Sequence, residues 1–294
     1  MRPQQEHLPA NYRPLPAARQ QQARDGARGL HDRLLPDRLT GVIELHVEAV
    51  DSLRIGSGIA ELVGAGASTQ LAAGIALRDG EPYLPGSSIK GMLRSLGEAI
   101  GGGCNLDPDC GGGRGASPCA ICSLFGQIRR DGQLMGRVGF SDALPAPGAE
   151  VGMELLHLPR AFQPRRQVGR RIYDVPEAQH PPEVPSLVVP PGSKFVTKLQ
   201  LLNVRPDELG LLLLAAGCDG TFLPRLGGGK YAGLGRVRFL PRRAMLRGSY
   251  RQLKPEILDG EPLALAVSSW LAAFRPCPGS AAALDALRGG GEAR

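Results

Sequence analysis

The feature that most constrains the fold of this chain is a turn followed by an amphipathic helix, near residue 90. The stretch reads Leu84-Pro85-Gly86-Ser87-Ser88-Ile89-Lys90-Gly91-Met92-Leu93-Arg94. Proline and glycine predict the turn, and either Ser87 or Ser88 is a suitable N-cap. Apolar residues three and four apart predict a helix that runs to about Ile100. Its N-terminus, with Lys90 and Arg94 beside it, suits a phosphate group, although an ordinary strand–turn–helix connection has the same pattern.

A second stretch rich in glycine and basic residues lies towards the other end of the chain. It reads Leu226-Gly227-Gly228-Gly229-Lys230-Tyr231-Ala232-Gly233-Leu234-Gly235-Arg236-Val237-Arg238-Phe239. Tyr after Lys excludes a Walker A loop, and a strand that follows the loop excludes a dinucleotide fingerprint. Gly228 and Gly229 would expose backbone N–H groups to a sugar–phosphate chain, with charge from Lys230 and Arg236. A glycine-rich hairpin inside a sheet is the alternative.

Basic residues are in excess and are clustered. The chain has 35 Lys and Arg against 28 Asp and Glu, a net charge of +7, which favours a polyanionic partner. No acid interrupts the arginines of residues 160–171 or the basic residues of 225–251. Arginine suits bidentate phosphate contacts. The first of these segments adds Arg165, Arg170 and Arg171 as candidate ligands. Arg54, which shortly precedes Gly56 and Gly58, is a further candidate.

Four cysteines follow the predicted helix within a loop of Gly, Pro and Asp, residues 101–127. They are Cys104, Cys110, Cys119 and Cys122, and the last two form a C-x2-C pair. Four thiolates at this spacing predict a closed, structural Zn²⁺ site. Unrelated free thiols and redox chemistry are the alternatives. A disulfide knot does not fit the cytoplasmic location that we expect for a chain without a secretory signal or a membrane-length apolar run.

The order of the predicted elements indicates an α+β protein. We expect an extended N-terminal arm, a core with one antiparallel sheet and two helices on one face in a split βαβ arrangement, and a C-terminal segment. The arm covers residues 1–40, the core 41–240 and the basic C-terminal segment 241–294. Within the core, alternating apolar residues predict strands at 41–50 and 194–204. We expect an irregular loop at 59–80 and a long projecting insertion at 144–193.

Four of these segments resemble the RAMP superfamily of type III CRISPR–Cas systems, in the expected order. Residues 84–94 look like the family's "PGSSLKGxLR" segment, and residues 119–126 resemble its "CxxCxLFG" element. Residues 136–143 look like a "GRVxFSDA" strand, and residues 227–237 like the C-terminal glycine-rich loop. Together they span roughly residues 41–240.

The resemblance implies a ferredoxin-like (RRM-like) core and a Cas7-like backbone subunit of an RNA-guided effector complex. It implies guide RNA (crRNA) and target RNA as partners, together with other CRISPR effector subunits and no membrane. Ser87, Ser88, Lys90 and Arg94 would hold guide phosphates, and residues 151–193 would form a thumb that inserts into the guide–target duplex.

One departure bears on catalysis. Target-cleaving members carry an aspartate before the segment that resembles residues 78–88, whereas no acid lies between Glu61 and Asp79 here. Metal-assisted RNA cleavage needs such a group, so we expect a subunit that holds RNA and has no catalytic residue of its own. A guide-processing endoribonuclease of the same superfamily and a zinc-stabilised RNA-binding module outside CRISPR are the alternatives.

Overall fold

The computed structural model describes most of the chain. The described residues are 12–23, 31–64, 66–105, 107, 109–111, 117–130, 132–159, 169–173, 183–247, 252 and 254–289. Among their helices, none combines the length and the apolar character that a membrane span requires.

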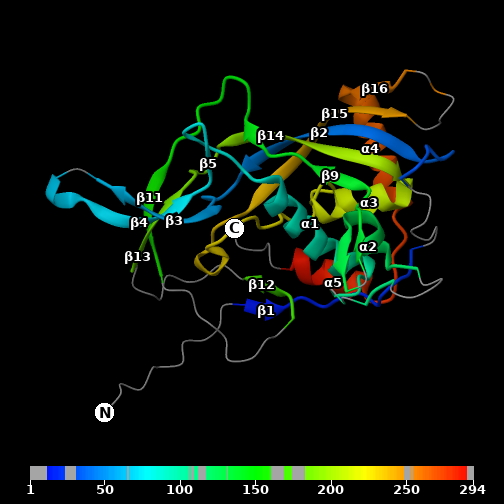
Figure 1. Ribbon diagram of the computed structural model, residues 1–294, viewed down its shortest axis with the longest axis horizontal. Coiled ribbons are helices and arrows are strands. Elements are labelled where there is room, and N and C mark those ends of the chain that lie inside the picture. Colours follow the sequence, from blue (N-terminus) through cyan, green and yellow to red (C-terminus); the bar gives the residue numbers. More distant parts are fainter. Residues whose placement is uncertain are drawn as a thin grey trace, which may run out of the picture.

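A six-stranded sheet forms the centre of the molecule, in the order β10-β14-β2-β15-β16, with β9 also paired to β14 (Figure 1). Its strands are β2 (Leu39–Ala49), β9 (Val138–Phe140), β10 (Leu144–Pro145), β14 (Lys194–Val204), β15 (Val237–Arg247) and β16 (Glu256–Asp259). All of the pairings are antiparallel. The two strands predicted from alternation are confirmed, since Ile43, Leu45 and Val47 are fully buried between polar neighbours.

Helices cover one face of this sheet. They are α1 (Gly86–Gly101), α2 (Ala120–Phe125), α3 (Pro206–Ala215), α4 (Gly260–Ala273) and α5 (Ser280–Arg288). In Figure 1, α1 and α3 lie beside each other beneath the sheet, and α5 lies below α1. The central elements therefore follow the order strand, helix, strand, strand, helix, strand: β2, α1, β9 with β10, β14, α3 and β15.

A second sheet projects to the left of the helices in Figure 1, in the order β11-β13-β4-β3. Its strands are β3 (Gly56–Val63), β4 (Gln70–Ile75), β11 (Glu154–Leu158) and β13 (Val184–Val188). The expected irregular loop at 59–80 is therefore wrong. The predicted insertion, 144–193, supplies two of these strands, and β13 pairs with β4 in parallel.

Shorter elements complete the fold. They are β1 (Tyr12–Pro14), β5 (Leu77–Arg78), β6 (Glu81–Pro82), β7 (Gln127–Arg129), β8 (Gly132–Leu134), β12 (Arg171–Tyr173), and the 3-10 turns Gly66–Ser68 and Lys230–Ala232. The described part of the predicted arm runs along the core, because β1 pairs with β12 and the Ala18 N–H donates to Ala99 O at the end of α1.

The start of α1 differs from the prediction. The N-cap is Pro85, and neither serine side chain caps the helix. Instead the Gly86 N–H donates to Asp142 Oδ1 at 2.8 Å, from the turn after β9. A Cβ atom at Gly86 would lie 2.3 Å from Phe140 O. The glycine is thus required because the helix begins directly against the backbone of β9.

Replacement of Gly86 by alanine is expected to destabilise the protein by about 1–3 kcal/mol, because the added methyl group has no room. Gly91 in the same helix is the matched control, since a Cβ there meets nothing within 4 Å. Gly91→Ala is expected to stabilise the helix by up to about 1 kcal/mol. Urea unfolding of both variants measures the difference, and equal free energies of unfolding would contradict the close approach.

Candidate functional site

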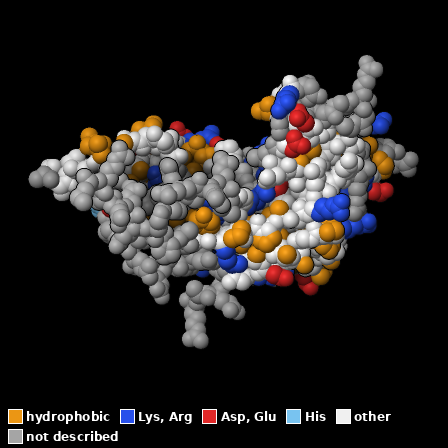
Figure 2. All heavy atoms as spheres, turned by 90° about the horizontal axis from the view of Figure 1, so that it is seen from below, with side chains coloured by type: hydrophobic (Ala, Val, Ile, Leu, Met, Phe, Trp, Pro, Cys, Tyr) orange, Lys and Arg blue, Asp and Glu red, His pale blue; other side chains and the backbone are white. Residues whose placement is uncertain are grey.

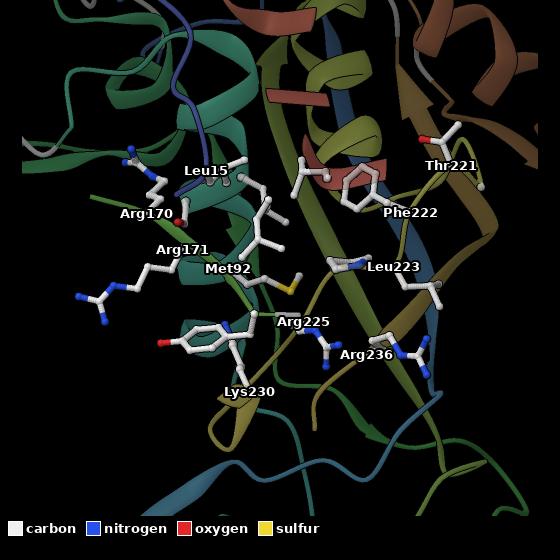
Figure 3. A pocket seen from close by; sticks show the side chains of 17 residues that line it. Leu15, Met92, Arg170, Arg171, Thr221, Phe222, Leu223, Arg225, Lys230 and Arg236 are labelled. Carbon is white, nitrogen blue, oxygen red and sulfur yellow. The ribbon is translucent and has the colours of Figure 1, made fainter. Parts of the chain in front are cut away.

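A cavity of about 340 Å³ lies between α1, the glycine loop and residues 170–173 (Figure 3). Its basic lining residues are Arg170, Arg171, Arg225, Lys230 and Arg236. Its larger apolar lining residues are Leu15, Met92, Leu96, Phe222, Leu223 and Leu287. No Asp or Glu is among the described residues that line it. The cavity therefore offers both cationic and apolar groups to a ligand.

One carboxylate behind the cavity holds two of these arginines. Arg236 donates to Asp51 through Nε and Nη2, both at 2.8 Å, which raises the pKa of Arg236. Arg225 lies 3.7 Å from the same carboxylate and also donates to the carbonyls of Gly233 and Leu234. The two arginines therefore share one carboxylate at this part of the cavity.

A second carboxylate is shared in the same way. Glu98 of α1 is almost fully buried and accepts hydrogen bonds from both Arg94 and Arg170. Burial, and then the neighbouring Arg94 charge, lower the pKa of Arg170. Two arginines again share one carboxylate, so among the described partners at this wall positive charges outnumber negative ones.

Lys230 and Arg171 have no acidic partner within the described ranges. Burial, followed by the charge of Arg225, lowers the pKa of Lys230. The guanidinium of Arg171 stacks over the Tyr12 ring at 4.8 Å, and its buried Nε has no hydrogen-bond partner there. A desolvated cation without a counter-charge is costly, so an anion bound beside Lys230 would stabilise its charged form.

The glycine loop is held against Arg54. The Gly228 N–H donates to Arg54 O at 2.7 Å, and a Cβ atom at Gly227 would lie 2.4 Å from that oxygen. Gly227 and Gly229 both have positive φ, at 81° and 73°. The predicted residues Arg54, Gly228, Gly229 and Lys230 are therefore neighbours.

The predicted residues at the start of α1 form a separate group. Ser87 is exposed and Ser88 is half-buried. Lys90 lines a different cavity of about 620 Å³, together with Arg94, Gly126 and the hairpin of β7 and β8. Burial, and then the charge of Arg94, lower the pKa of Lys90. The two cavities share no lining residue among those described, but Glu98 connects them because it accepts hydrogen bonds from Arg94 and Arg170.

Two predicted ligands stand apart. Arg165 lies outside the described residues. Arg94 is already engaged inside the protein, by Glu98, Gly126 and Cys122.

Sequence analysis also missed cavity residues, notably Arg225 and Phe222. The basic segment 225–251, which contains no Asp or Glu, was a signal for Arg225, but no sequence feature marked Phe222. In the view from below, Lys and Arg side chains are spread over the face among hydrophobic and acidic ones (Figure 2).

The four cysteines of the predicted metal site come together. All are buried, and their Sγ atoms lie within 4.8 Å of one another. Cys104 Sγ and Cys122 Sγ are 3.4 Å apart, near the roughly 3.8 Å edge of a tetrahedron with 2.3 Å metal–sulfur bonds. The N–H of Cys119 donates to Cys110 Sγ, and the N–H of Cys122 donates to Cys119 Sγ. These residues fit a metal ion that prefers four sulfur ligands.

The thiols are electrostatically unequal. A hydrogen bond from the Cys122 thiol lowers the pKa of Cys119 to about 5. The pKa of Cys122 is raised, first because its thiol donates this hydrogen bond to Cys119 and then because it is buried. Burial is also the main cause that raises the pKa of Cys110 to about 12. The cluster thus favours the thiolate form at Cys119 over Cys110 and Cys122, and a metal ion held by all four sulfurs would displace the remaining protons.

Comparison with known proteins places this geometry in a family. No curated protein matches the chain. One matching solved structure, described as "Type IV-B CRISPR Complex", has 15% identity and a TM-score of 0.38, and covers 71% of this chain and 91% of that one. The profile of the RAMP superfamily matches residues 46–238, which include the end of β2, α1, the cysteines, β14 and the glycine loop. The chain therefore belongs to the RAMP superfamily.

Proposed function

We propose that this protein is a guide-RNA-binding, Cas7-like backbone subunit of a type III CRISPR effector complex. The observation that carries the proposal is the cavity with five basic residues and no acidic lining residue in the described chain. Such a surface suits a phosphodiester backbone, and its apolar groups suit the face of a base or ribose. Membership of the RAMP superfamily agrees with it.

The RNA would contact two groups of residues. In and beside the cavity these are Arg54, Arg170, Arg171, Gly228, Gly229, Lys230 and Arg236. At the start of α1 they are Ser87, Ser88 and Lys90. Arg165 belongs to the same proposal as part of the insertion. In this account the chain binds guide and target RNA in the cytoplasm with other effector subunits, and it does not itself cleave RNA.

The proposed core is ferredoxin-like. The order β2, α1, β9 with β10, β14, α3 and β15 has the βαββαβ sequence of elements typical of that fold, with the helices on one face. Residues 151–193 are the proposed thumb, a role supported by their strands β11 and β13 in the projecting second sheet.

The test of RNA binding is a salt titration with a fluorescent single-stranded RNA. If several phosphates are neutralised, the logarithm of the affinity falls linearly with the logarithm of the salt concentration, by about 0.7 per phosphate. An affinity that does not depend on salt would contradict the proposed backbone contacts. Cleavage of a repeat RNA by the purified chain would instead indicate a processing enzyme.

We propose that the cysteine cluster binds a structural Zn²⁺, which would hold the loop of α2 against α1. Cys119→Ser is expected to abolish stoichiometric zinc binding and the stabilisation that zinc confers, about 4 kcal/mol when free zinc is a thousand times its dissociation constant. Cys277→Ser is the control, since Cys277 contacts Ser280 and is not one of the four clustered cysteines. Equal zinc content in both variants, measured by elemental analysis, would contradict the site.

A further inference from the structure

Arg94 joins helix α1 to the cysteine cluster. Its Nη2 donates to Cys122 Sγ at 3.2 Å, and its Nη1 donates to Gly126 O at 2.6 Å. The side chain is only 15% exposed. Gly126 is the C-cap of α2, and its N–H in turn donates to Cys122 O. One guanidinium therefore holds both a cysteine sulfur and the end of the short helix that carries it.

The guanidinium is fixed from the other side by Glu98. Arg94 Nε donates to Glu98 Oε1 at 3.1 Å, one turn along α1. Glu98 is 2% exposed and also accepts a hydrogen bond from Arg170. The orientation of Arg94 towards Cys122 is thus fixed by its contacts with Glu98 and Gly126.

The contact between Arg94 and Cys122 would compensate part of the negative charge of a metal centre at these sulfurs. Four thiolates around a divalent ion carry a net charge of −2, which is costly in a buried site unless donors face the sulfurs. Among the described residues, the two backbone donors face Cys110 and Cys119, and neither is charged. Among these described residues, Arg94 is the charged group that donates a hydrogen bond to a cysteine sulfur. Hydrogen bonds between ions are about twice as strong as neutral ones.

We propose that Arg94 is a positioning residue of the metal centre, which donates a hydrogen bond to Cys122 Sγ and orients this sulfur for the metal. It is not primarily a phosphate ligand. This inference rests on the proposed metal site and extends it to a residue outside the cysteine loop. Its physical consequence is that the basic helix and the metal centre depend on each other, because Arg94 belongs to both.

The experiment is a Co²⁺ titration of the purified full chain, followed by the sulfur-to-cobalt charge-transfer absorption, with a competing chelator to obtain the affinity. Arg94→Met is expected to weaken metal binding about 10- to 100-fold, as removal of outer hydrogen-bond partners does in other metal sites. Arg94→Lys keeps the charge but cannot make all three contacts, so we expect an intermediate loss.

Arg130→Met is the matched control. Arg130 lies on the same side of the molecule, is 76% exposed, and faces Asp109 beside Cys110 at 3.6 Å. The variant removes an arginine near the cluster without removing a sulfur contact, so its metal affinity is expected to equal that of the unchanged chain. Circular dichroism at saturating metal shows whether each variant is folded, and Arg94→Lys provides the comparison if Arg94→Met is not.

The outcomes separate the two proposals. If the unchanged chain shows no charge-transfer absorption, the proposed metal site itself is wrong. If the unchanged chain binds Co²⁺ and folded Arg94→Met or Arg94→Lys binds it equally tightly, the metal site stands and the role of Arg94 is overturned. If Arg130→Met loses as much affinity as Arg94→Met, general charge is responsible, which also overturns it.

Discussion

The double variant Lys230→Met/Arg171→Met is expected to bind guide-length single-stranded RNA about 100-fold more weakly than the unchanged chain. These two cations have no acidic partner in the described chain, so an incoming phosphate is their natural counter-charge. Each charge-assisted contact contributes roughly 1.5 kcal/mol. The salt slope is expected to fall by about 1.4, which corresponds to two phosphate contacts on a single strand. Fluorescence anisotropy across salt concentrations measures both values.

The stability of the Lys230→Met variant separates binding from folding. Burial lowers the pKa of Lys230, which means that the folded protein disfavours its charged form. Methionine keeps the apolar stem and removes that cost, so the single variant is expected to be at least as stable as the unchanged chain in urea. A large loss of stability would show that Lys230 serves the fold.

Arg238→Met is the matched control for the RNA measurement. Arg238 also belongs to the basic segment, but it is exposed and pairs with Glu48 at 2.8 Å, away from the cavity lining. Its loss is expected to change RNA affinity by less than about 3-fold, as for an exposed, already paired charge. An equal loss in both variants would mean that RNA responds to total charge and that the cavity is not its site.

Arg137→Met is expected to destabilise the protein by about 3–5 kcal/mol, because it leaves the carboxylate of Glu208 buried without its cation. The Arg137 side chain is 1% exposed and forms a bidentate pair with Glu208, with distances of 2.9 and 2.5 Å. It also donates to Asn203 O at 2.8 Å. The pair connects the start of β9 with the start of α3, where Glu208 also accepts the Arg205 N–H.

The double variant Arg137→Met/Glu208→Gln tests the origin of that loss. Glutamine removes the second charge and retains an oxygen that can cap α3, so most of the lost stability is expected to return. Urea unfolding of the two variants measures the free-energy difference. If Arg137→Met costs less than about 1 kcal/mol, or if the double variant is no more stable than the single one, the buried pair does not have the role described here.

Local patterns predicted the central elements well. In β2 and β14 one face is buried, so apolar and polar residues alternate, and the apolar residues of α1 recur at helical spacing. The strand β3 gave no such signal, because most of its residues are exposed and Gly56 and Gly58 interrupt it. Its sheet is also held by the pairing of β4 with β13, more than a hundred residues apart. No local pattern records such a contact.

The site was predictable in chemistry and less so in geometry. The cysteine spacing pointed to the cluster that forms, and the basic loop pointed to the cavity. The roles of individual charges depended on distant partners. Asp142, and not Ser87 or Ser88, accepts the hydrogen bond at the start of α1. Arg94 donates to Cys122 and to Glu98 inside the protein. A basic residue in the sequence does not show whether its charge is free for RNA or paired within the fold.

The most direct measurement of the central proposal is to express the chain with its genomic neighbours, purify the assembly, and sequence the RNA that co-purifies. We expect a discrete RNA of guide length derived from CRISPR repeats, and we expect its yield to fall when Lys230→Met/Arg171→Met replaces the unchanged chain. An assembly that forms without RNA, or that carries only heterogeneous cellular RNA at the same level in both cases, would contradict a guide-binding role for this subunit.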